Sequence, residues 1–200
     1  MATIKLDRTT SCSRAINYAE KRATVKSGLN CDVDYAKTEM KQVRMLVGKD
    51  DKIQAHLVIQ SFRPGEVTAE QANQMGHELA QEIAPHHQVS IYTHTDKDHI
   101  HNHLVINSID LETGKKYQAH GKEAIERVQA FNDKLCLKHE LEVTQKENPA
   151  EKRTLSEIKL KSLGKEVWKD EIRSKIDSTM GTPSTIDFKT FSDHLKSEGI

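Results

Sequence analysis

Short segments with alternating or continuous apolar residues predict strands in the first half of the chain. Residues 3–8 alternate apolar and polar side chains, and three later segments are rich in Val, Ile and Leu. Segments of this kind, bounded by turn residues, are typical of strands. We expect strands at residues 3–8, 53–62, 89–95 and 103–110. A turn at residues 112–114 then sends the chain back toward residues 116–117.

Apolar residues at helical spacing predict helices between and after these strands. Thr68 and Gln71 form a capping-box pattern, in which a hydroxyl and an amide three residues apart satisfy the first helical N–H groups. In the helix before it, Asp32 is the expected N-cap and Gly48 the expected end. We expect helices at residues 13–24, 33–47, 68–83 and 121–140, with a break at 27–30.

The alternation of strands and helices predicts the fold class. Several of the strands are joined by short turns, which favours antiparallel pairing. We therefore expect an α+β fold in which a central, mainly antiparallel sheet of about five strands is covered by helices.

The character of the sequence changes after residue 147. Residues 151–200 are dominated by Lys, Glu and Leu, a composition that favours helices. The pattern is interrupted at residues 181–184, and another amphipathic helix starts at residue 188. We expect a first domain at residues 1–147 and a C-terminal helical extension at residues 148–200, cut from a longer protein.

Charge and hydropathy narrow the class of protein. The 30 basic and 30 acidic side chains balance, so the chain lacks the strong positive charge of a bulk nucleic-acid binder. The first fifty residues carry 10 basic and 6 acidic side chains, which allows a local basic surface. No stretch approaches the roughly 18 apolar residues of a membrane span, and the amino terminus lacks the apolar segment of a signal peptide. We expect a cytoplasmic protein without membrane insertion.

Histidine is unusually frequent and unevenly placed. The chain has 11 histidines, and His94, His99, His101 and His103 lie within ten positions. Because strand residues two apart point to one face, His101 and His103 share a side with Asn107. His94 ends the neighbouring predicted strand and can approach from across the turn. Three imidazoles arranged in this way form a metal site with coordination positions open for a substrate, as in catalytic sites.

Two sets of three histidines fit this description. His99 is two residues from His101, so the set His99, His101 and His103 is an alternative to the set His94, His101 and His103. We favour the set with His94, because three alternating residues of one strand would stack along a line. Asp96 lies close enough in sequence to accept a hydrogen bond from a ligating imidazole, as such imidazoles usually require.

Tyr18 has unusual surroundings. On the predicted helix 13–24, the positions three or four residues away include Arg14, Lys21 and Arg22, so the phenol and three cations share a face. Cations bind phosphates and favour the phenolate, which is what a tyrosine attacking a phosphodiester requires. The same pattern also fits an exposed tyrosine on a solvated basic face.

Three groups of residues resemble, in order, the three motifs of plasmid mobilisation relaxases, which are HUH-type endonucleases. The groups are Asn17-Tyr18, then His56 to Phe62 with Pro64-Gly65-Glu66, then His94-x-Asp96-x4-His101-x-His103-x3-Asn107. The sequence looks most like the MOBP branch, and the resemblance covers about residues 1–145. Asn102 departs from the pattern, because the family has a hydrophobic residue between its last two histidines.

The resemblance implies a reaction and a cofactor. Tyr18 would attack a phosphodiester of single-stranded DNA at the nick site of a transfer origin, giving a 5′-phosphotyrosyl adduct and a free 3′-hydroxyl. His94, His101 and His103 would hold a divalent metal ion, Mg²⁺ or Mn²⁺ in the cell, and three nitrogens also suit Zn²⁺ or Ni²⁺ in vitro.

The resemblance also implies contacts with DNA and with other proteins. Asp96 and Asn107 match positions that support the metal site. Ser61 matches the second motif, which lies near the nicked DNA. The residues that we expect to contact the DNA are Arg14, Lys21, Arg22 and Ser61. Accessory mobilisation proteins and a type IV coupling protein are the implied protein partners.

Two other functions stay open on the sequence alone. A rolling-circle replication initiator of the same superfamily usually carries its tyrosine after the histidines, whereas Tyr18 precedes them. A non-catalytic metal- and DNA-binding module would use the histidines for a structural ion. If the chain nicks DNA, Tyr92 is the alternative nucleophile because it shares a strand face with His94, although its place inside a strand favours packing. Replacing Tyr18 by Phe separates these functions.

Overall fold

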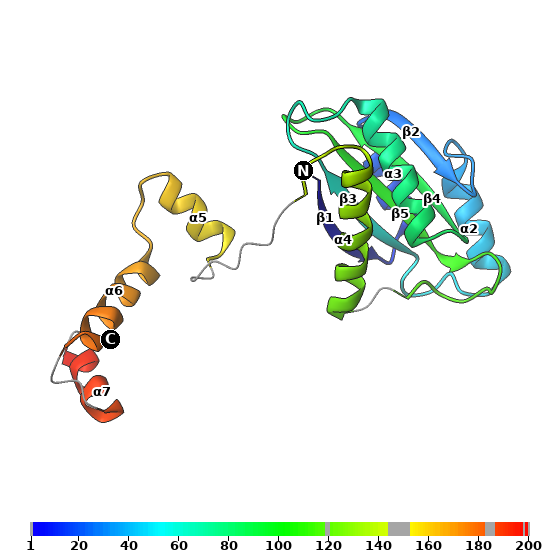
Figure 1. Cartoon of the computed structure of the whole chain (residues 1–200). Helices are drawn as coiled ribbons and strands as arrows, with labels where there is room; N and C mark the ends of the chain where they lie inside the picture. The colour runs from blue at the N-terminus through cyan, green and yellow to red at the C-terminus, as the bar shows by residue number, and fades with distance from the viewer. Residues whose placement is uncertain (1, 119–120, 144–152, 183–186, 198, 200) are drawn as a thin grey trace. The chain divides into compact units, whose positions relative to one another are not determined.

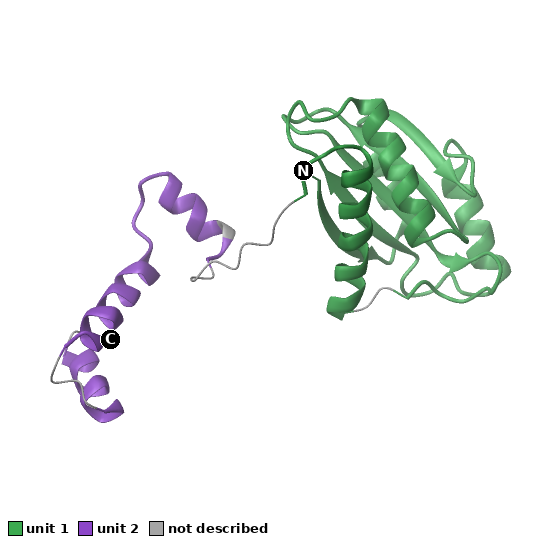
Figure 2. Cartoon of the chain, in the orientation of Figure 1, with its two compact units in different colours: residues 1–145 green, residues 146–200 purple. Residues whose placement is uncertain are grey.

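The computed structural model describes residues 2–118, 121–143, 153–182, 187–197 and 199. The chain divides into two compact units, Met1–Gln145 and Lys146–Ile200 (Figure 2). Among the described residues, no helix is both long enough and apolar enough to cross a membrane.

Within the described residues, a five-stranded antiparallel sheet forms the centre of the first unit (Figure 1). Its strands are β1 (Thr3–Thr9), β2 (Ala23–Leu29), β3 (Ala55–Ser61), β4 (His87–His94) and β5 (His101–Asp110). Their order across the sheet is β1-β3-β5-β4-β2, and each pair of neighbours is antiparallel. Strand β5, which carries two of the clustered histidines, therefore lies in the middle.

Helices cover both faces of this sheet. The helices described in the first unit are α1 (Cys12–Glu20), α2 (Ala36–Leu46), α3 (Ala69–Ile83) and α4 (Gly121–Lys138). Val105 of β5 packs with α1 and α2, whereas Leu104 and Ile106 belong to the larger core under α3 and α4. Since alternate strand residues point to opposite faces, His101 and His103 lie on the side of α1.

The predicted α+β class is confirmed, and so are most of its elements. The four predicted strands correspond to β1, β3, β4 and β5, with ends that differ by at most two residues. The predicted capping box is present at the start of α3: Gln71 N donates to Thr68 Oγ1 at 3.2 Å, and Thr68 N donates to Gln71 Oε1 at 2.9 Å.

The helix predicted at residues 13–24 is wrong in its last third. Helix α1 ends at Glu20, and β2 follows as a strand paired with β4. Thr24 and Val25 are β-branched residues, which favour a strand over a helix. Gly28, which we expected to lie in a break after the first helix, lies inside β2. A Cβ there would clash with the carbonyl oxygen of Cys31, so the strand requires glycine at this close approach.

Helix α2 begins later than predicted. It starts at Ala36 with Tyr35 as its N-cap residue, not at residue 33 with Asp32 as the cap. The Asp32 carboxylate instead accepts a hydrogen bond from Asp34 N at 2.9 Å, which holds a turn ahead of the helix. Gly48 has a φ of 66° and follows the end of the helix, as predicted.

The second unit is helical where the structure describes it. Its helices are α5 (Leu155–Ser162), α6 (Trp168–Met180) and α7 (Phe188–Ser197). The predicted helical extension is thus confirmed. The break predicted at residues 181–184 lies partly outside the described residues, because residues 183 and 184 are not among them.

Candidate active site

The clustered histidines gather at one end of the sheet because the strands hold them in register. His94, the last residue of β4, lies opposite His101, the first residue of β5. Ser61, the last residue of β3, faces His101 from the other side. His103 follows two positions later on the same face of β5. One row of the sheet therefore places Ser61, His101 and His94 side by side.

Three imidazoles of this cluster converge. One ring nitrogen from each of His94, His101 and His103 lies within 4.8 Å of the others, and among the described residues these three form the group that could hold a metal ion. Two nitrogens bound to one ion at about 2.1 Å lie about 3–4 Å apart, so small rotations of the rings bring all three to ligating distance. The donor set, three imidazoles without a carboxylate or a thiolate, fits a divalent ion that keeps open positions.

The protonation state of the cluster also suits a metal. Burial, together with the neighbouring imidazoles of His94 and His101, lowers the pKa of His103 to about 4. Burial lowers the pKa of His101 as well. These rings are therefore neutral near pH 7, and a metal ion does not have to displace a proton to bind them.

Backbone carbonyls orient two of the rings. His94 Nε2 donates to the carbonyl oxygen of Ala19 at 2.6 Å, and His101 Nδ1 donates to the carbonyl oxygen of His99 at 3.3 Å. Each bond fixes a tautomer and leaves the other nitrogen, Nδ1 of His94 and Nε2 of His101, as the ligating atom. Ala19 belongs to α1, the helix that carries Tyr18. This helix therefore directly contacts a candidate metal ligand.

His99 and Asp96 take other positions than the converging rings. The His99 ring lies 5.3 Å from that of His101 but outside the group of three. We expected Asp96 to accept a hydrogen bond from an imidazole, but its carboxylate pairs with Arg22 Nη1 at 3.3 Å. The hydrogen-bonding role expected of Asp96 falls to the carbonyls of Ala19 and His99.

Tyr18 lies at the edge of the histidine cluster. Its side chain is 60% exposed, and its ring stands edge-on to that of His103, with centroids 5.8 Å apart and an interplanar angle of 84°. Ile16 and Ala19, on the opposite face of α1, are buried against the sheet. Burial of that face turns Tyr18 toward the solvent beside the histidines.

We predicted that Arg14, Lys21 and Arg22 share one helical face with Tyr18. This prediction is wrong for Lys21 and Arg22, which lie beyond the last residue of α1. Lys21 caps the C-terminus of α1 and Arg22 lies in the turn beyond it, because the helix ends early. The side chain of Arg22 nevertheless lies over Tyr18, with its guanidinium carbon 5.9 Å from the centre of the ring. Arg14, one turn before Tyr18, is the cation that remains on the helix.

A groove of about 320 Å³ runs beside the tyrosine. Its wall on α1 includes Arg14 and Tyr18, its floor includes Leu57 and Ile59 of β3, and His103 lies at its edge. The two floor residues are half-buried, so an apolar surface is open beside a cation and the candidate metal ligands. This combination fits a nucleic-acid strand, which offers bases to the apolar floor and phosphates to the cations.

Tyr92, the alternative nucleophile, is buried. Its side chain is fully covered in the core under α1 and α2, and burial raises the pKa of Tyr92 to about 12. Within the described residues its hydroxyl lies near Ser90 without a well-formed hydrogen bond. A fully buried phenol cannot reach a phosphate, whereas Tyr18 is open to one.

Asn107 lies at the other end of β5 from the histidines. It shares their face, as predicted, but its amide bonds the buried side chain of Arg44 at 3.0 Å, the carbonyl of Met40 at 3.2 Å and Gln88 at 2.9 Å. We expected Asn107 to support the metal site. The structure instead places it in a polar network under α2.

Asn102, which departs from the family pattern, points away from the metal ligands. It is fully buried on the face under α3, where it donates to Gln60 Oε1 at 2.9 Å and to the carbonyl of Ala72 at 2.5 Å. It also accepts from Thr93 Oγ1 at 2.7 Å. These bonds satisfy the amide, so a polar residue fits at a position between two histidines where the family has an apolar one.

Two features of the structure, the role of the Ala19 carbonyl and the burial of Arg44, could not be predicted from the sequence. The carbonyl of Ala19 has no sequence signal, because every residue has one. Arg44 appears in a polar position of an amphipathic helix, yet only 1% of its surface is exposed. A hydrophobic pattern treats a cation as a surface residue, so burial of Arg44 becomes visible only in the structure.

The sequence of this chain matches a known family. Residues 14–141 match the model of the nuclease domain of MobA/VirD2-like relaxases, which covers more than half of the chain. The chain belongs to this relaxase family, which confirms the resemblance drawn from its motifs.

Curated relatives extend the match to the whole chain. Two proteins named rlx from Staphylococcus aureus are 57% and 52% identical over the full chain. The chain spans 63% and 61% of their lengths, so it corresponds to about three fifths of each relative. The group II intron-interrupted relaxase LtrB of Lactococcus lactis is 38% identical over 71 residues, 34% of this chain and 13% of LtrB.

Solved structures share the fold. The MobM relaxase domain bound to plasmid pMV158 oriT DNA, in an Mn-bound crystal structure, superimposes with a TM-score of 0.54 at 15% identity. The match covers 79% of this chain and 97% of MobM. A second MobM complex gives a TM-score of 0.52 at 14% identity, over 78% of this chain and 98% of that one. At these identities the likeness shows the fold.

Proposed function

We propose that this chain nicks and rejoins one strand of DNA at a plasmid transfer origin and so starts conjugative mobilisation. The observation that carries the proposal is the place of Tyr18, which is exposed, lines a groove and has its ring centre 5.8 Å from that of His103. Relaxase family membership supports it, and so does the fold shared with MobM, which is bound to oriT DNA. In this proposal residues 1–147 are the catalytic domain and residues 148–200 a helical extension.

Tyr18 is the proposed nucleophile. Its phenolic oxygen attacks the scissile phosphorus and forms a new P–O bond, while the bond to the 3′-oxygen breaks and that oxygen leaves as a 3′-hydroxyl. The product is a 5′-phosphotyrosyl adduct, and because one ester replaces another, the reverse reaction rejoins the strand without a nucleotide cofactor. The guanidinium carbon of Arg22 lies 5.9 Å from the centre of the Tyr18 ring, where it is placed to contact the phosphate under attack.

His94, His101 and His103 are the proposed metal ligands, with Mg²⁺ or Mn²⁺ as the ion in the cell. When bound, the ion would polarise the phosphate and stabilise the negative charge that develops during attack. The chain's own contribution is to hold three imidazoles on the side of α1, with two of their tautomers fixed by the carbonyls of Ala19 and His99.

The DNA would enter along the groove. Arg14 on its wall and Arg22 and Lys21 next to it are the proposed phosphate contacts, and Ser61 lies at the same end of the sheet as the histidines. We propose single-stranded DNA as the substrate, because the apolar floor of Leu57 and Ile59 fits unpaired bases. Accessory mobilisation proteins and a coupling protein are the proposed protein partners, and we propose the cytoplasm as the place of action.

A covalent-adduct assay tests the proposal. The chain is incubated with single-stranded oligonucleotides that span the transfer origin of its own replicon, with and without Mn²⁺, and run on a denaturing gel. We expect a shifted, Mn²⁺-dependent band that Tyr18→Phe reduces below about one thousandth. Tyr35→Phe is the matched control, because Tyr35 is also exposed, at 66%, but lies outside the groove.

Two other outcomes of this assay would contradict part or all of the proposal. A band that survives Tyr18→Phe would overturn the assignment of the nucleophile. Failure of the wild-type chain to form a band, although it binds Mn²⁺ and the oligonucleotides, would replace the nicking enzyme with a non-catalytic binding module.

A further inference from the structure

The helix that carries Tyr18 is capped by a residue from another part of the chain. Ser11, the N-cap residue of α1, makes no side-chain cap, and the first turn holds no acidic residue. The N–H of Cys12, which has no partner within the helix, instead donates to Gln54 Oε1 at 3.1 Å. Since a helix cap fixes the first turn, Gln54 holds the start of α1 from outside the helix.

Gln54 is itself held from several directions. Its Nε2 donates to the carbonyl of Asp50 at 2.9 Å. Its backbone N–H donates to Thr9 of β1 at 2.9 Å, and its carbonyl accepts from Ser108 of β5 at 3.0 Å. The cap on α1 is therefore fixed to the sheet, and to the same strand that carries His101 and His103.

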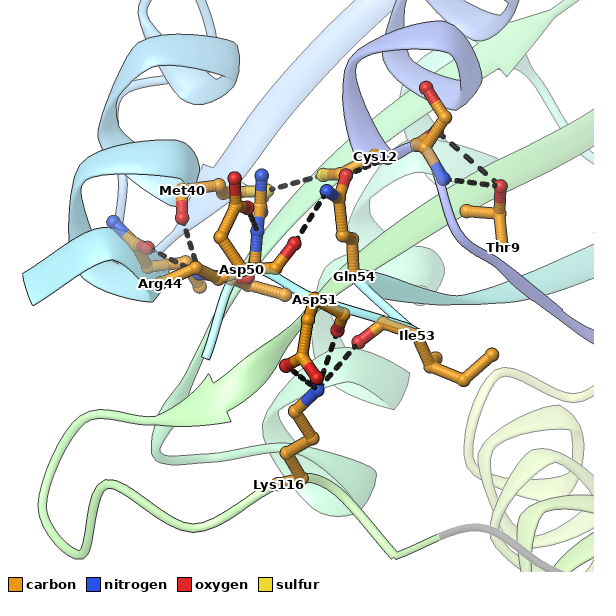
Figure 3. A network of polar contacts seen from close by, with 12 residues as sticks. Thr9, Cys12, Met40, Arg44, Asp50, Asp51, Ile53, Gln54 and Lys116 are labelled. Atoms are coloured by element: carbon orange, nitrogen blue, oxygen red, sulfur yellow. Dashed lines mark hydrogen bonds and ion pairs between the residues drawn. The ribbon is translucent and has the colours of Figure 1, made fainter. Parts of the chain in front are cut away.

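Arg44 continues the network into the core, as Figure 3 shows for its contacts with Asp50. Arg44 Nε donates to Asp50 Oδ1 at 2.7 Å, and Arg44 Nη1 donates to Asn107 Oδ1 of β5 at 3.0 Å. The guanidinium is 99% buried, since only 1% of the side chain is exposed. Burial of a cation costs desolvation free energy, so this ion pair is a weak source of stability. Its effect is instead geometric, because the planar guanidinium holds Asp50 and Asn107 in fixed positions.

Helix α1 is joined to the sheet by a hydrogen bond at each end. Gln54 holds the first turn through the N–H of Cys12, and His94 Nε2 holds the last turn through the carbonyl oxygen of Ala19 at 2.6 Å. The buried residues between and at these ends are Cys12, Ile16 and Ala19. Tyr18, at the other end of the helix, must stay within reach of the candidate metal site. A misplacement of about 1 Å between reacting groups lowers a rate by about a hundredfold.

We propose that Gln54 and Arg44 are positioning residues that set where Tyr18 lies relative to His103. Gln54 anchors the first turn of α1, and Arg44 locks the loop of Asp50 and Gln54 onto β5 through Asn107. Neither residue touches the DNA or the reacting atoms. The proposal rests on the proposed function, in which Tyr18 reacts beside His94, His101 and His103.

The variants separate positioning from folding. Gln54→Leu removes both the acceptor for Cys12 N–H and the donor to the carbonyl of Asp50, whereas Gln54→Glu loses only the donor and keeps the acceptor that caps α1. Arg44→Lys keeps the buried charge but has one nitrogen, which cannot reach both Asp50 and Asn107 in the way the guanidinium does. Gln74→Leu, on the exposed face of α3, is the matched control.

The first measurement is single-turnover cleavage of a transfer-origin oligonucleotide with Mn²⁺, together with the affinity for the DNA. We expect Gln54→Leu and Arg44→Lys to lower the cleavage rate by about tenfold to a hundredfold with DNA affinity unchanged. Gln54→Glu should stay within about threefold of the wild type, and Gln74→Leu should match it.

The second measurement follows the position of Tyr18 directly. With 3-fluorotyrosine in the chain, the four tyrosines give four ¹⁹F signals, and Tyr18→Phe assigns one of them. Bound Mn²⁺ broadens a nearby signal with the inverse sixth power of distance. We expect strong broadening of the Tyr18 signal in the wild type and in Gln54→Glu, and a changed broadening in Gln54→Leu and Arg44→Lys.

Loss of stability alone would lower the denaturation midpoint of the variants and leave the broadening of the Tyr18 signal and the rate of the folded protein unchanged. That result would overturn the positioning role. A wild-type chain that binds Mn²⁺ without broadening the Tyr18 signal would overturn the proposed function instead, and the positioning role with it.

Discussion

His94 Nε2 donates a hydrogen bond of 2.6 Å to the carbonyl oxygen of Ala19, the residue next to Tyr18. The bond joins the last turn of α1 to the end of β4. Carbonyls near a helix C-terminus carry partial negative charge, which strengthens them as acceptors. The candidate nucleophile and one candidate metal ligand are therefore held by a single contact, and movement of α1 would disturb both.

Tyr92→Phe should leave nicking intact. The Tyr92 hydroxyl is buried without a well-formed hydrogen bond, so its removal costs no interaction and relieves a desolvated polar group. We expect a free energy of unfolding equal to the wild type or about 1 kcal/mol higher, measured by urea denaturation. A large loss of adduct in this variant would give Tyr92 a catalytic part that its burial does not allow.

The metal-free chain should lose stability in mild acid. Burial lowers the pKa of His87, His101 and His103, that of His103 to about 4, whereas histidines of an unfolded chain titrate near about 6.5. Below that pH the unfolded state binds more protons than the folded state, so the free energy of unfolding falls as the pH drops from about 6.5 toward about 4. Above about 6.5 these groups add no pH dependence.

Urea denaturation at about pH 7.5 and about pH 5.5 measures this effect. Mn²⁺ should raise the free energy of unfolding more at the higher pH, because protons compete with the ion for the imidazoles. His103→Gln should reduce both the pH dependence and the gain from Mn²⁺. Equal stability of the metal-free chain at the two pH values would contradict the burial that we assign to these rings.

Arg14→Gln should weaken DNA binding in a salt-dependent way. Arg14 lies on the wall of the groove, and loss of one phosphate contact lowers the slope of log affinity against log salt by about 0.7 for single-stranded DNA. Lys138→Gln is the control, because Lys138 is equally cationic but lies on α4, over the opposite face of the sheet. Identical slopes for the two variants would remove Arg14 from the DNA path.

Gly76→Ala should disturb the metal site through Asn102, which lies on the α3 face of the sheet, opposite to the histidines. A Cβ at residue 76 would lie 2.7 Å from Asn102 Nδ2 and 3.1 Å from Ile91 Cγ2. We expect a loss of about 1–3 kcal/mol in the free energy of unfolding, as for overpacked cores, and weaker Mn²⁺ binding, because Asn102 lies between His101 and His103. Calorimetric Mn²⁺ titration checks the second effect. Gln74→Ala on the exposed face of α3 should change neither, and equal behaviour of both variants would refute the link.

The histidine cluster could be predicted from sequence because its geometry is local. His94 and His101 end and begin two strands joined by a short turn, so the antiparallel register alone places them opposite each other. His-x-His spacing then adds His103 on the same face. What spacing could not decide was the place of His99, which depends on how the turn folds.

Longer-range features could not be predicted in this way. Asn107 does share a face with the histidines, but four residues of strand past His103 span about 13 Å, so it reaches α2 instead of the metal site. Strand β2 was missed because its alternation is interrupted by Ser27 and Gly28, and its pairing with β4 overrides the weak local signal.

The measurement that tests the central claim most directly is the mapping of the covalent DNA adduct. The adduct formed with Mn²⁺ and a transfer-origin oligonucleotide is digested with nuclease and trypsin, and the modified peptide is identified by mass spectrometry. We predict a nucleotide on the tryptic peptide of residues 15–21, attached to Tyr18. A nucleotide on a peptide that contains Tyr35, Tyr92 or Tyr117 would contradict the account.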